Sequence, residues 1–71
     1  MTETQAAYHA ALSGRIKTPI GEGAIVSNAG EGQYLVLFSR KEHTPEAWLK
    51  ISPNNGPCVF RVFDAEELEA L

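Results

Sequence analysis

The chain has few cysteines and histidines, the residues that most often form disulfides, bind metals or act as nucleophiles and bases. It has 71 residues and a single cysteine, Cys58, so no disulfide can form within it. A secreted domain of this size usually needs disulfides, and the first residues lack the basic start and apolar block of a signal peptide. No apolar run approaches the ~20 residues that a membrane helix needs. We therefore expect a cytoplasmic protein that does not span a membrane.

Positive charge is also scarce. Six lysines and arginines face nine aspartates and glutamates, which gives a net charge of −3. Binding to nucleic-acid phosphates usually needs a basic surface, so this balance disfavours nucleic acid as a partner. The apolar content of 44% is that of an ordinary globular chain. The length predicts one domain, residues 1–71, which buries only roughly 60% of its unfolded surface.

The chain begins with a predicted helix over residues 1–13. Thr2 and Gln5 have the spacing of a capping box, in which each side chain bonds a backbone N–H of the other. Alanines are frequent in the segment and favour a helix. Tyr8, Ala11 and Leu12 fall on one face and predict a narrow apolar stripe. A helix this short needs support from the rest of the domain.

A proline and two glycines lie in Thr18–Gly23 and predict a tight bend that leads into a strand at 24–27. A glycine-rich turn over 28–32 then precedes a second strand at 33–38. Its residues 34–38 are apolar without alternation, which predicts a central strand covered on both faces.

Residues 44–51 fit two structures. Apolar residues alternate at 47, 49 and 51, which predicts a strand, and the turn residues at 52–57 favour this alternative because they suit a hairpin. Thr44 followed by Pro45 instead indicates the start of a helix.

The next strand is predicted at 58–63, with Cys58, Phe60 and Val62 on one face and Val59, Arg61 and Phe63 on the other. Cys58 is expected to face the core as a small hydrophobic residue. A short acidic helical turn is predicted at 64–71, where Asp64 caps and Glu67 follows three residues later.

Short strands joined by glycine-rich turns predict a mainly β (α+β) fold, a small antiparallel barrel over residues 15–63 between two helical ends. The bend Thr18–Gly23, a "TPxGxG" pattern, resembles the entry to small bacterial SH3-like barrels of the KOW and PSP1-associated type. The hairpin strand at 34–38 and the acidic ending at 66–68 resemble the same proteins. The resemblance implies a binding module for protein or nucleic acid, and rarely an enzyme.

No catalytic or metal-binding constellation is predicted, and no cofactor. The segment 21–23 is too short for a phosphate-binding loop and precedes a strand. Cys58, His9 and His43 show neither metal-ligand spacing nor a nucleophile–base pattern. The acidic residues near the C-terminus are expected to form a solvated surface, and a docking surface for a basic partner is the alternative.

One surface remains as a candidate for binding. If the segment 47–51 is a strand, Trp48 points away from Leu49 and Ile51, and two alternatives follow. A terminal helix covers Trp48, which is the favoured one, or an exposed aromatic and basic patch binds a protein partner. The patch would contain Trp48, Tyr34, Phe63, Arg61 and Lys50.

A nucleic-acid-binding or ribosome-associated barrel is the alternative function, with Arg40, Lys41, Lys50 and Arg61 on phosphates. A small enzyme is the least favoured class, because so short a chain hardly encloses a substrate pocket. Self-association through an uncovered strand edge or the aromatic face is a further expectation. The sequence does not identify the partner.

Overall fold

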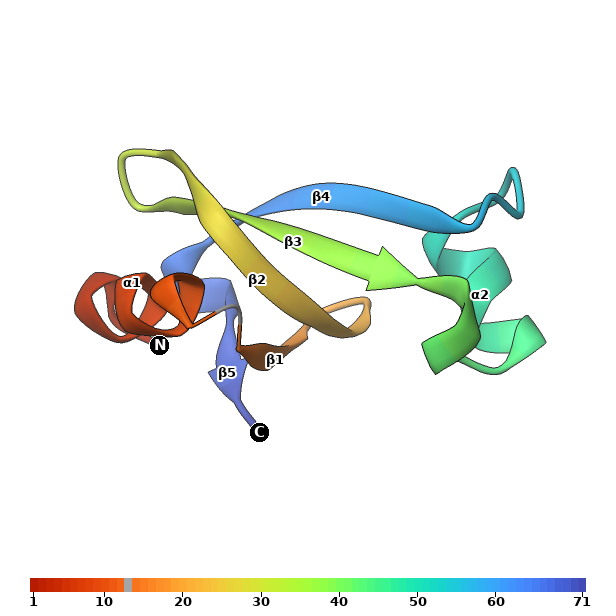
Figure 1. Ribbon diagram of the computed structural model, residues 1–71, viewed down its shortest axis with the longest axis horizontal. Helices are drawn as coiled ribbons and strands as arrows, with labels where there is room; N and C mark the ends of the chain where they lie inside the picture. Colours follow the sequence, from red (N-terminus) through yellow and green to blue (C-terminus); the bar gives the residue numbers. More distant parts are fainter. Residues whose placement is uncertain (13) are drawn as a thin grey trace.

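The computed structural model of the chain describes residues 1–12 and 14–71 and shows a small α+β fold (Figure 1). Ser13, the last residue of the predicted first helix, lies outside the described residues. The elements are α1 (Glu3–Ala11), β1 (Arg15–Thr18), β2 (Gly21–Gly30), β3 (Gln33–Ser39), the 3-10 turn η1 (Arg40–Glu42), α2 (Pro45–Ile51), β4 (Cys58–Asp64), the 3-10 turn η2 (Ala65–Glu67) and β5 (Glu69–Ala70).

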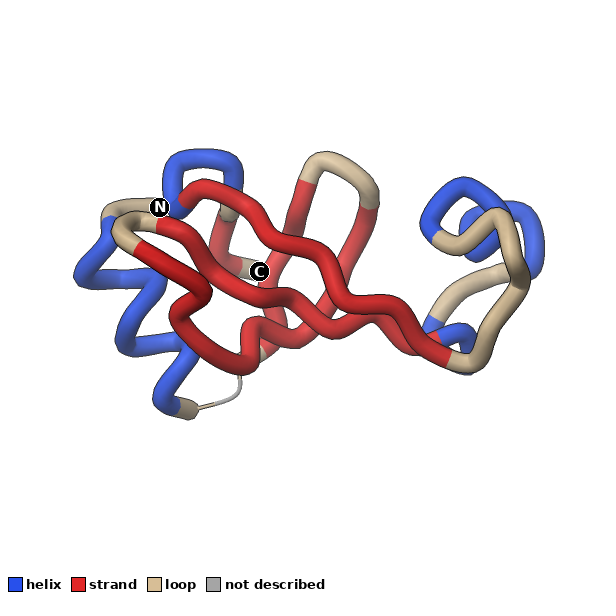
Figure 2. The backbone as a smooth tube through the Cα atoms, turned by 90° about the horizontal axis from the view of Figure 1, so that it is seen from above, coloured by secondary structure: helices blue, strands red, loops and turns tan. Residues whose placement is uncertain are grey.

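The strands form one antiparallel sheet in the order β4-β3-β2-β1-β5. β2 pairs with β1 through its first residues and with β3 through the rest, and two register shifts interrupt its pairing with β3. The sheet does not close, because β4 and β5 are its two edges. The molecule measures 33 × 21 × 18 Å, and it is elongated because α2 and its loops extend beyond one end of the sheet (Figure 2).

The predicted bend at Thr18–Gly23 is confirmed as the turn between β1 and β2. The Thr18 hydroxyl donates to the Gly21 carbonyl at 2.6 Å and accepts from the Ile20 N–H at 3.2 Å. Gly21 has φ +134°, which a residue with a side chain rarely adopts. Gly23 serves another purpose, because a Cβ there would lie 2.7 Å from Val36 Cγ1. Its lack of a side chain lets β2 approach the inward side chains of β3.

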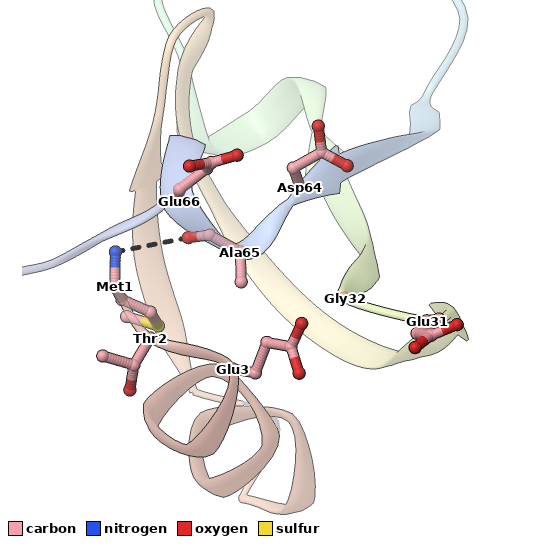
Figure 3. A pocket seen from close by; sticks show the side chains of 8 residues that line it. All are labelled: Met1, Thr2, Glu3, Glu31, Gly32, Asp64, Ala65 and Glu66. Atoms are coloured by element: carbon pink, nitrogen blue, oxygen red, sulfur yellow. Dashed lines mark hydrogen bonds between the residues drawn. The ribbon is translucent and has the colours of Figure 1, made fainter.

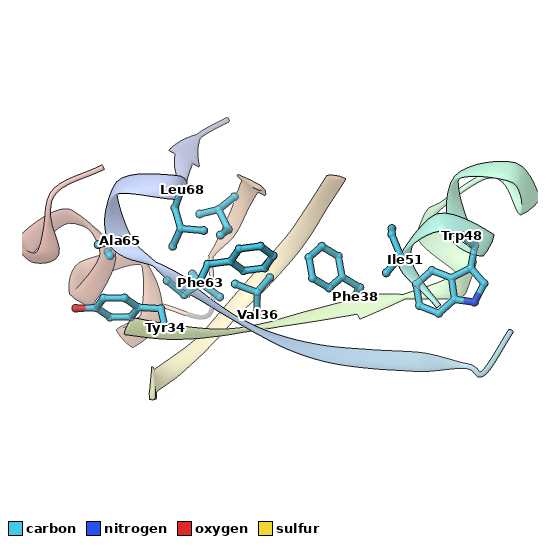
Figure 4. Packing of buried hydrophobic residues seen from close by; sticks show 11 residues of the cluster. Tyr34, Val36, Phe38, Trp48, Ile51, Phe63, Ala65 and Leu68 are labelled. Atoms are coloured by element: carbon cyan, nitrogen blue, oxygen red, sulfur yellow. The ribbon is translucent and has the colours of Figure 1, made fainter. Parts of the chain in front are cut away.

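The core lies on one face of the sheet (Figure 4). Tyr34, Val36 and Phe38 of β3 point into it, and the intervening Leu35 and Leu37 point to the opposite face, where they are only half-buried. Residues of both helices belong to the same buried cluster. The prediction that β3 is covered on both faces is therefore wrong, since the apolar run has a partner layer on one side only.

α1 packs through its small side chains. The predicted capping box between Thr2 and Gln5 is confirmed. Ala6 is fully buried, whereas Tyr8 and Leu12 are exposed, so the predicted apolar stripe is wrong. Alanine lets the helix backbone come close to the sheet, and the Tyr34 hydroxyl donates to the Glu3 carbonyl at 3.1 Å.

α2 replaces the strand that the alternation at 47–51 favoured. The Thr44 hydroxyl accepts from the Ala47 N–H at 3.2 Å, and Pro45 occupies the first turn of the helix. Trp48 and Ile51, three residues apart, share the buried face, while Leu49 is 54% exposed. The strand prediction was wrong because the N-cap and the helical spacing of these two large side chains together outweigh a short alternating pattern.

The C-terminal segment is only partly helical. The predicted capping box between Asp64 and Glu67 is confirmed, but the helical turn ends after η2 and the chain continues as β5 on β1. Leu68 is fully buried and Leu71 is exposed. The α-ammonium group of Met1 donates to the Leu68 carbonyl at 2.6 Å and joins α1 to this segment.

Across residues 1–12 and 14–71, no helix combines the length and the apolar character needed to cross a membrane.

We predict that Gly23→Ala lowers the free energy of unfolding by about 1–3 kcal/mol, the usual cost of overpacking. The added methyl group would lie 2.9 Å from the Leu37 carbonyl oxygen, a backbone atom that cannot move aside without disturbing β3. Urea denaturation measures the change. Gly30→Ala is the control, because its nearest neighbour would be the flexible end of Gln33 at 3.3 Å. Equal losses in the two variants would contradict the close approach at Gly23.

We also predict that Trp48, the single tryptophan, resists quenching by iodide and acrylamide in the folded protein. Its side chain is fully buried and its Nε1 donates to the Gly56 carbonyl at 2.9 Å. Fluorescence in buffer and in urea measures the difference in accessibility. Quenching as strong in buffer as in urea would show that α2 does not pack as described.

Candidate functional site

The aromatic side chains of the predicted patch are not on the surface. Trp48 is fully buried and its ring lies 5.7 Å from that of His43. Tyr34 and Phe63 face the core of the sheet, where the Phe63 ring packs edge-on against Phe38 with 6.2 Å between centroids. The exposed aromatic patch is therefore wrong. Trp48 points inward from α2, with its ring beside His43 and its Nε1 on the Gly56 carbonyl, and the terminal helix α1 that the sequence suggested as its cover lies at the other end of the molecule (Figure 1).

Arg61 and Lys50, the basic members of the predicted patch, are exposed. The three aromatic side chains predicted beside them are buried, so the two basic residues do not form an aromatic and basic patch. The Arg61 guanidinium donates to the carbonyls of Phe60 at 3.2 Å and Ile51 at 3.3 Å. The bond to Ile51 ties β4 to the end of α2. The main visible role of Arg61 is thus to hold the loop between α2 and β4.

An apolar surface lies on the opposite, outer face of the sheet. Phe60 and Val62 of β4 are 53% and 50% exposed, and they stand beside Leu37 and Leu35 of β3 in the strand register. These four residues, Leu35, Leu37, Phe60 and Val62, are called the outer patch below. None of them carries a charge, and side chains paired across two strands in this way form one continuous surface.

The edge of the sheet at β4 also offers backbone groups. The Arg40 N–H donates to the Pro57 carbonyl at 3.1 Å, and the Ala65 N–H donates to the Gly32 carbonyl at 2.9 Å. Both bonds continue the unbroken register of β3 and β4, and strand residues direct their backbone groups alternately toward and away from a partner. The odd-numbered residues of β4 therefore face β3. The backbone groups of three residues point outward: Cys58, Phe60 and Val62.

This open edge has defined ends. β4 begins at Cys58, and the outward N–H of Asp64 near its other end donates to the Glu67 carboxylate at 3.0 Å. Of the features that protect an exposed edge, the stretch 58–62 contains no proline, no bulge and no lysine, and Arg61 is its single charged residue. The other edge of the sheet, β5, has only two residues. β4 is thus the accessible edge, and its side chains on the outer patch are apolar.

Cys58 is exposed, so the prediction that it faces the core is wrong. The alternation in β4 was predicted correctly, but the core lies on the side of Phe63, and Cys58 shares the outer face with Phe60 and Val62. The ring nitrogens of His43 lie 2.9 Å from the carbonyl oxygens of Ser39 and Glu22. Both nitrogens therefore point at backbone carbonyls and not at the Cys58 thiol.

A second surface feature is an acidic hollow of about 410 Å³ between α1, the β2–β3 turn and η2 (Figure 3). Four carboxylates line it, and Asp64 among them already accepts from the Gln33 amide at 3.4 Å. Within the described part of the chain, no group of three or more His, Cys, Asp and Glu side chains is arranged to hold a metal ion. The hollow is a solvated acidic surface, and its carboxylates are Glu3, Glu31, Asp64 and Glu66.

Phe60 and Val62 were missed by sequence reasoning, which placed them in the core. Alternation shows which residues share a face, but it does not show which face is covered. One signal could have corrected the assignment. Phe63 belongs to the same strand and is as large as Phe60, so both faces of β4 are apolar. A chain of 71 residues is too short to cover both faces of a sheet, so one of these apolar faces had to remain exposed.

The comparisons with known proteins add no family to this geometry. No protein-family model, no curated protein sequence and no solved structure matches the chain.

Proposed function

We propose that the protein is a non-enzymatic interaction module that binds a protein partner through the β4 edge and the outer patch. One observation carries the proposal: the same strand presents outward backbone groups and half-exposed phenylalanine and valine side chains. An extended segment that adds to a sheet edge forms main-chain hydrogen bonds there, and side chains on the adjoining face give it specificity.

The arrangement of charge favours a protein over a nucleic acid. The four basic residues considered for phosphate contacts lie on different elements: Arg40 and Lys41 on η1, Lys50 on α2 and Arg61 on β4. The guanidinium groups of Arg40 and Arg61 already donate to backbone carbonyls. The net charge of −3 opposes approach to a phosphate backbone. We therefore expect no retardation of RNA or DNA at low salt.

An SH3-like arrangement is part of the proposal. It is supported by the strand order, in which β1 pairs with both β2 and β5 and so brings the last strand back to the first. The long β2 is shared between β1 and β3, and its pairing with β3 contains two register shifts of the kind that bend a strand. The cytoplasmic location expected from the sequence also stays a prediction.

A capture experiment tests the proposed surface. The wild-type chain, Phe60→Lys and Leu49→Lys are immobilised and exposed to extract of the source cell, and the retained proteins are quantified by mass spectrometry. Lysine at position 60 puts a charge at the centre of the surface, so we expect at least a tenfold loss of the bound protein, as for a central contact residue.

Leu49→Lys is the matched control, because Leu49 is exposed to the same degree as Phe60, 54% against 53%, but lies on α2. We expect it to retain the partner. If Phe60→Lys and the wild type retain the same proteins in equal amounts, the β4 surface is not the binding site. If none of the three retains any protein, a second copy of the chain included, the proposed function fails.

A further inference from the structure

We infer that the partner at the β4 edge is a second copy of this chain, joined by antiparallel pairing of β4 with β4 about a two-fold axis at Phe60. The inference rests on the proposed function of this surface and names its partner. It follows from three properties of β4, which concern its free backbone groups, its symmetry and its charge.

The free backbone groups are centred on one residue. The open stretch runs from Cys58, where β4 begins, to Val62, the last outward residue before the capped N–H of Asp64, and its middle residue is Phe60. An isologous dimer requires a surface that matches itself after a two-fold rotation. A stretch with outward groups on its first, middle and last residues meets this requirement when the axis passes beside Phe60.

The pairing then satisfies every outward group of the stretch. Phe60 faces Phe60 of the second copy, and Cys58 faces Val62 in both directions. Residues that face each other in such pairs exchange two N–H···O bonds, so three pairs give about six intermolecular hydrogen bonds. The Phe60 carbonyl, which accepts from the Arg61 guanidinium, has a second lone pair for the new bond.

The same register joins the two outer patches. Cys58, Phe60 and Val62 all direct their side chains to the outer face, so the two Phe60 rings become neighbours and Val62 packs beside Cys58 of the other copy. Aromatic side chains opposite each other stabilise a strand pair. The result is a continuous ten-stranded sheet, twice the five strands of one copy, with a shared apolar surface at its centre.

The position of Arg61 selects this register over its neighbour. A shift of the axis from Phe60 to Arg61 would place the two Arg61 side chains directly opposite each other, and like charges in that position are destabilising. With the axis at Phe60, Arg61 lies opposite Val59 of the second copy. In this register the Arg61 side chain of each copy therefore lies beside an uncharged side chain of the other copy.

Charge also favours a second copy over a basic or acidic partner. Residues 58–63 contain no carboxylate, and their single charge, Arg61, is bound to backbone carbonyls. Two chains that each carry a net charge of −3 repel each other least when they meet through residues 58–63, which contain no negative charge. A partner recognised by its own charge would find no counterpart on the outer patch.

The size of the contact indicates a weak dimer. Seven strand residues span roughly 23 Å, and the outer patch adds four side chains, which places the contact at the low end of specific interfaces. We expect a dissociation constant in roughly the micromolar range.

Sedimentation velocity from about 1 μM to about 1 mM tests the association. The wild-type chain and Leu49→Lys should change from monomer to dimer across this range. Phe60→Lys, which places two ammonium groups side by side at the axis, should weaken the dimer at least tenfold. Circular dichroism verifies that the variants are folded. A wild-type chain that stays monomeric at every concentration, or a dimer that Phe60→Lys does not weaken, overturns the inference.

Cross-linking tests the register. In a Cys58→Ser background, Phe60→Cys puts its thiols in directly opposed positions, about 5.5 Å apart between Cα atoms, which a disulfide can bridge. Val62→Cys in the same background puts its thiols four residues apart along the strands, roughly 13 Å, which is too far. Mild oxidation should give a covalent dimer of the first variant only. Equal yields from both variants overturn the axis at Phe60.

Failure of the inference can be separated from failure of the proposed function. If the chain is monomeric but another protein is retained by the wild type and lost with Phe60→Lys, the surface binds a different partner and only the dimer is wrong. If the chain is monomeric and no protein is retained, both are wrong.

Discussion

The inward row of side chains on β3 is the interaction on which the rest of the fold depends. Tyr34, Val36 and Phe38 point to one face of the sheet, and every other buried element meets that row or its immediate neighbours. α1 reaches its start, where the Tyr34 hydroxyl bonds the Glu3 carbonyl, and α2 covers its end through Trp48 and Ile51. Gly23 keeps β2 close enough to pack against it.

A single covered face is a consequence of size. A chain of 71 residues buries only roughly 60% of its unfolded surface, and here both helices and η2 contribute their buried residues to the same side. The outer ends of Leu35, Leu37, Phe60 and Val62 are left without a covering layer. Because β4 is also an edge strand, apolar side chains and free backbone groups occur together on it, and that combination points to association with another polypeptide segment.

Local signals marked the starts of α1, α2 and η2, although at α2 the alternating pattern was favoured over the cap and a strand was predicted. The capping boxes at Thr2 and Asp64, the cap at Thr44 and the bend at Thr18–Gly23 depend on residues a few positions apart, so a short stretch of sequence contains the whole interaction. β1 and β5 gave no such signal. They are four and two residues long and are strands only because they pair with partners that are distant in sequence.

The candidate site could be predicted only in part for a related reason. The sequence showed that Phe60 and Phe63 lie on opposite faces of a strand, but the covered face is decided by where the chain folds back. Trp48 illustrates the same limit. A short alternation suggested a strand with Trp48 on its outer face, either covered by a terminal helix or exposed in a patch, whereas its place beside Ile51 on one side of α2 buries it.

Amide hydrogen exchange, measured by NMR on a dilute monomeric sample, tests the open edge of β4 most directly. The amides of Val59, Arg61 and Phe63 face β3 and should be protected, whereas those of Cys58, Phe60 and Val62 point outward and should exchange much faster. Protection of all six amides to the same degree would contradict this arrangement, because β4 would then be paired on both sides and the sheet would have no free edge there.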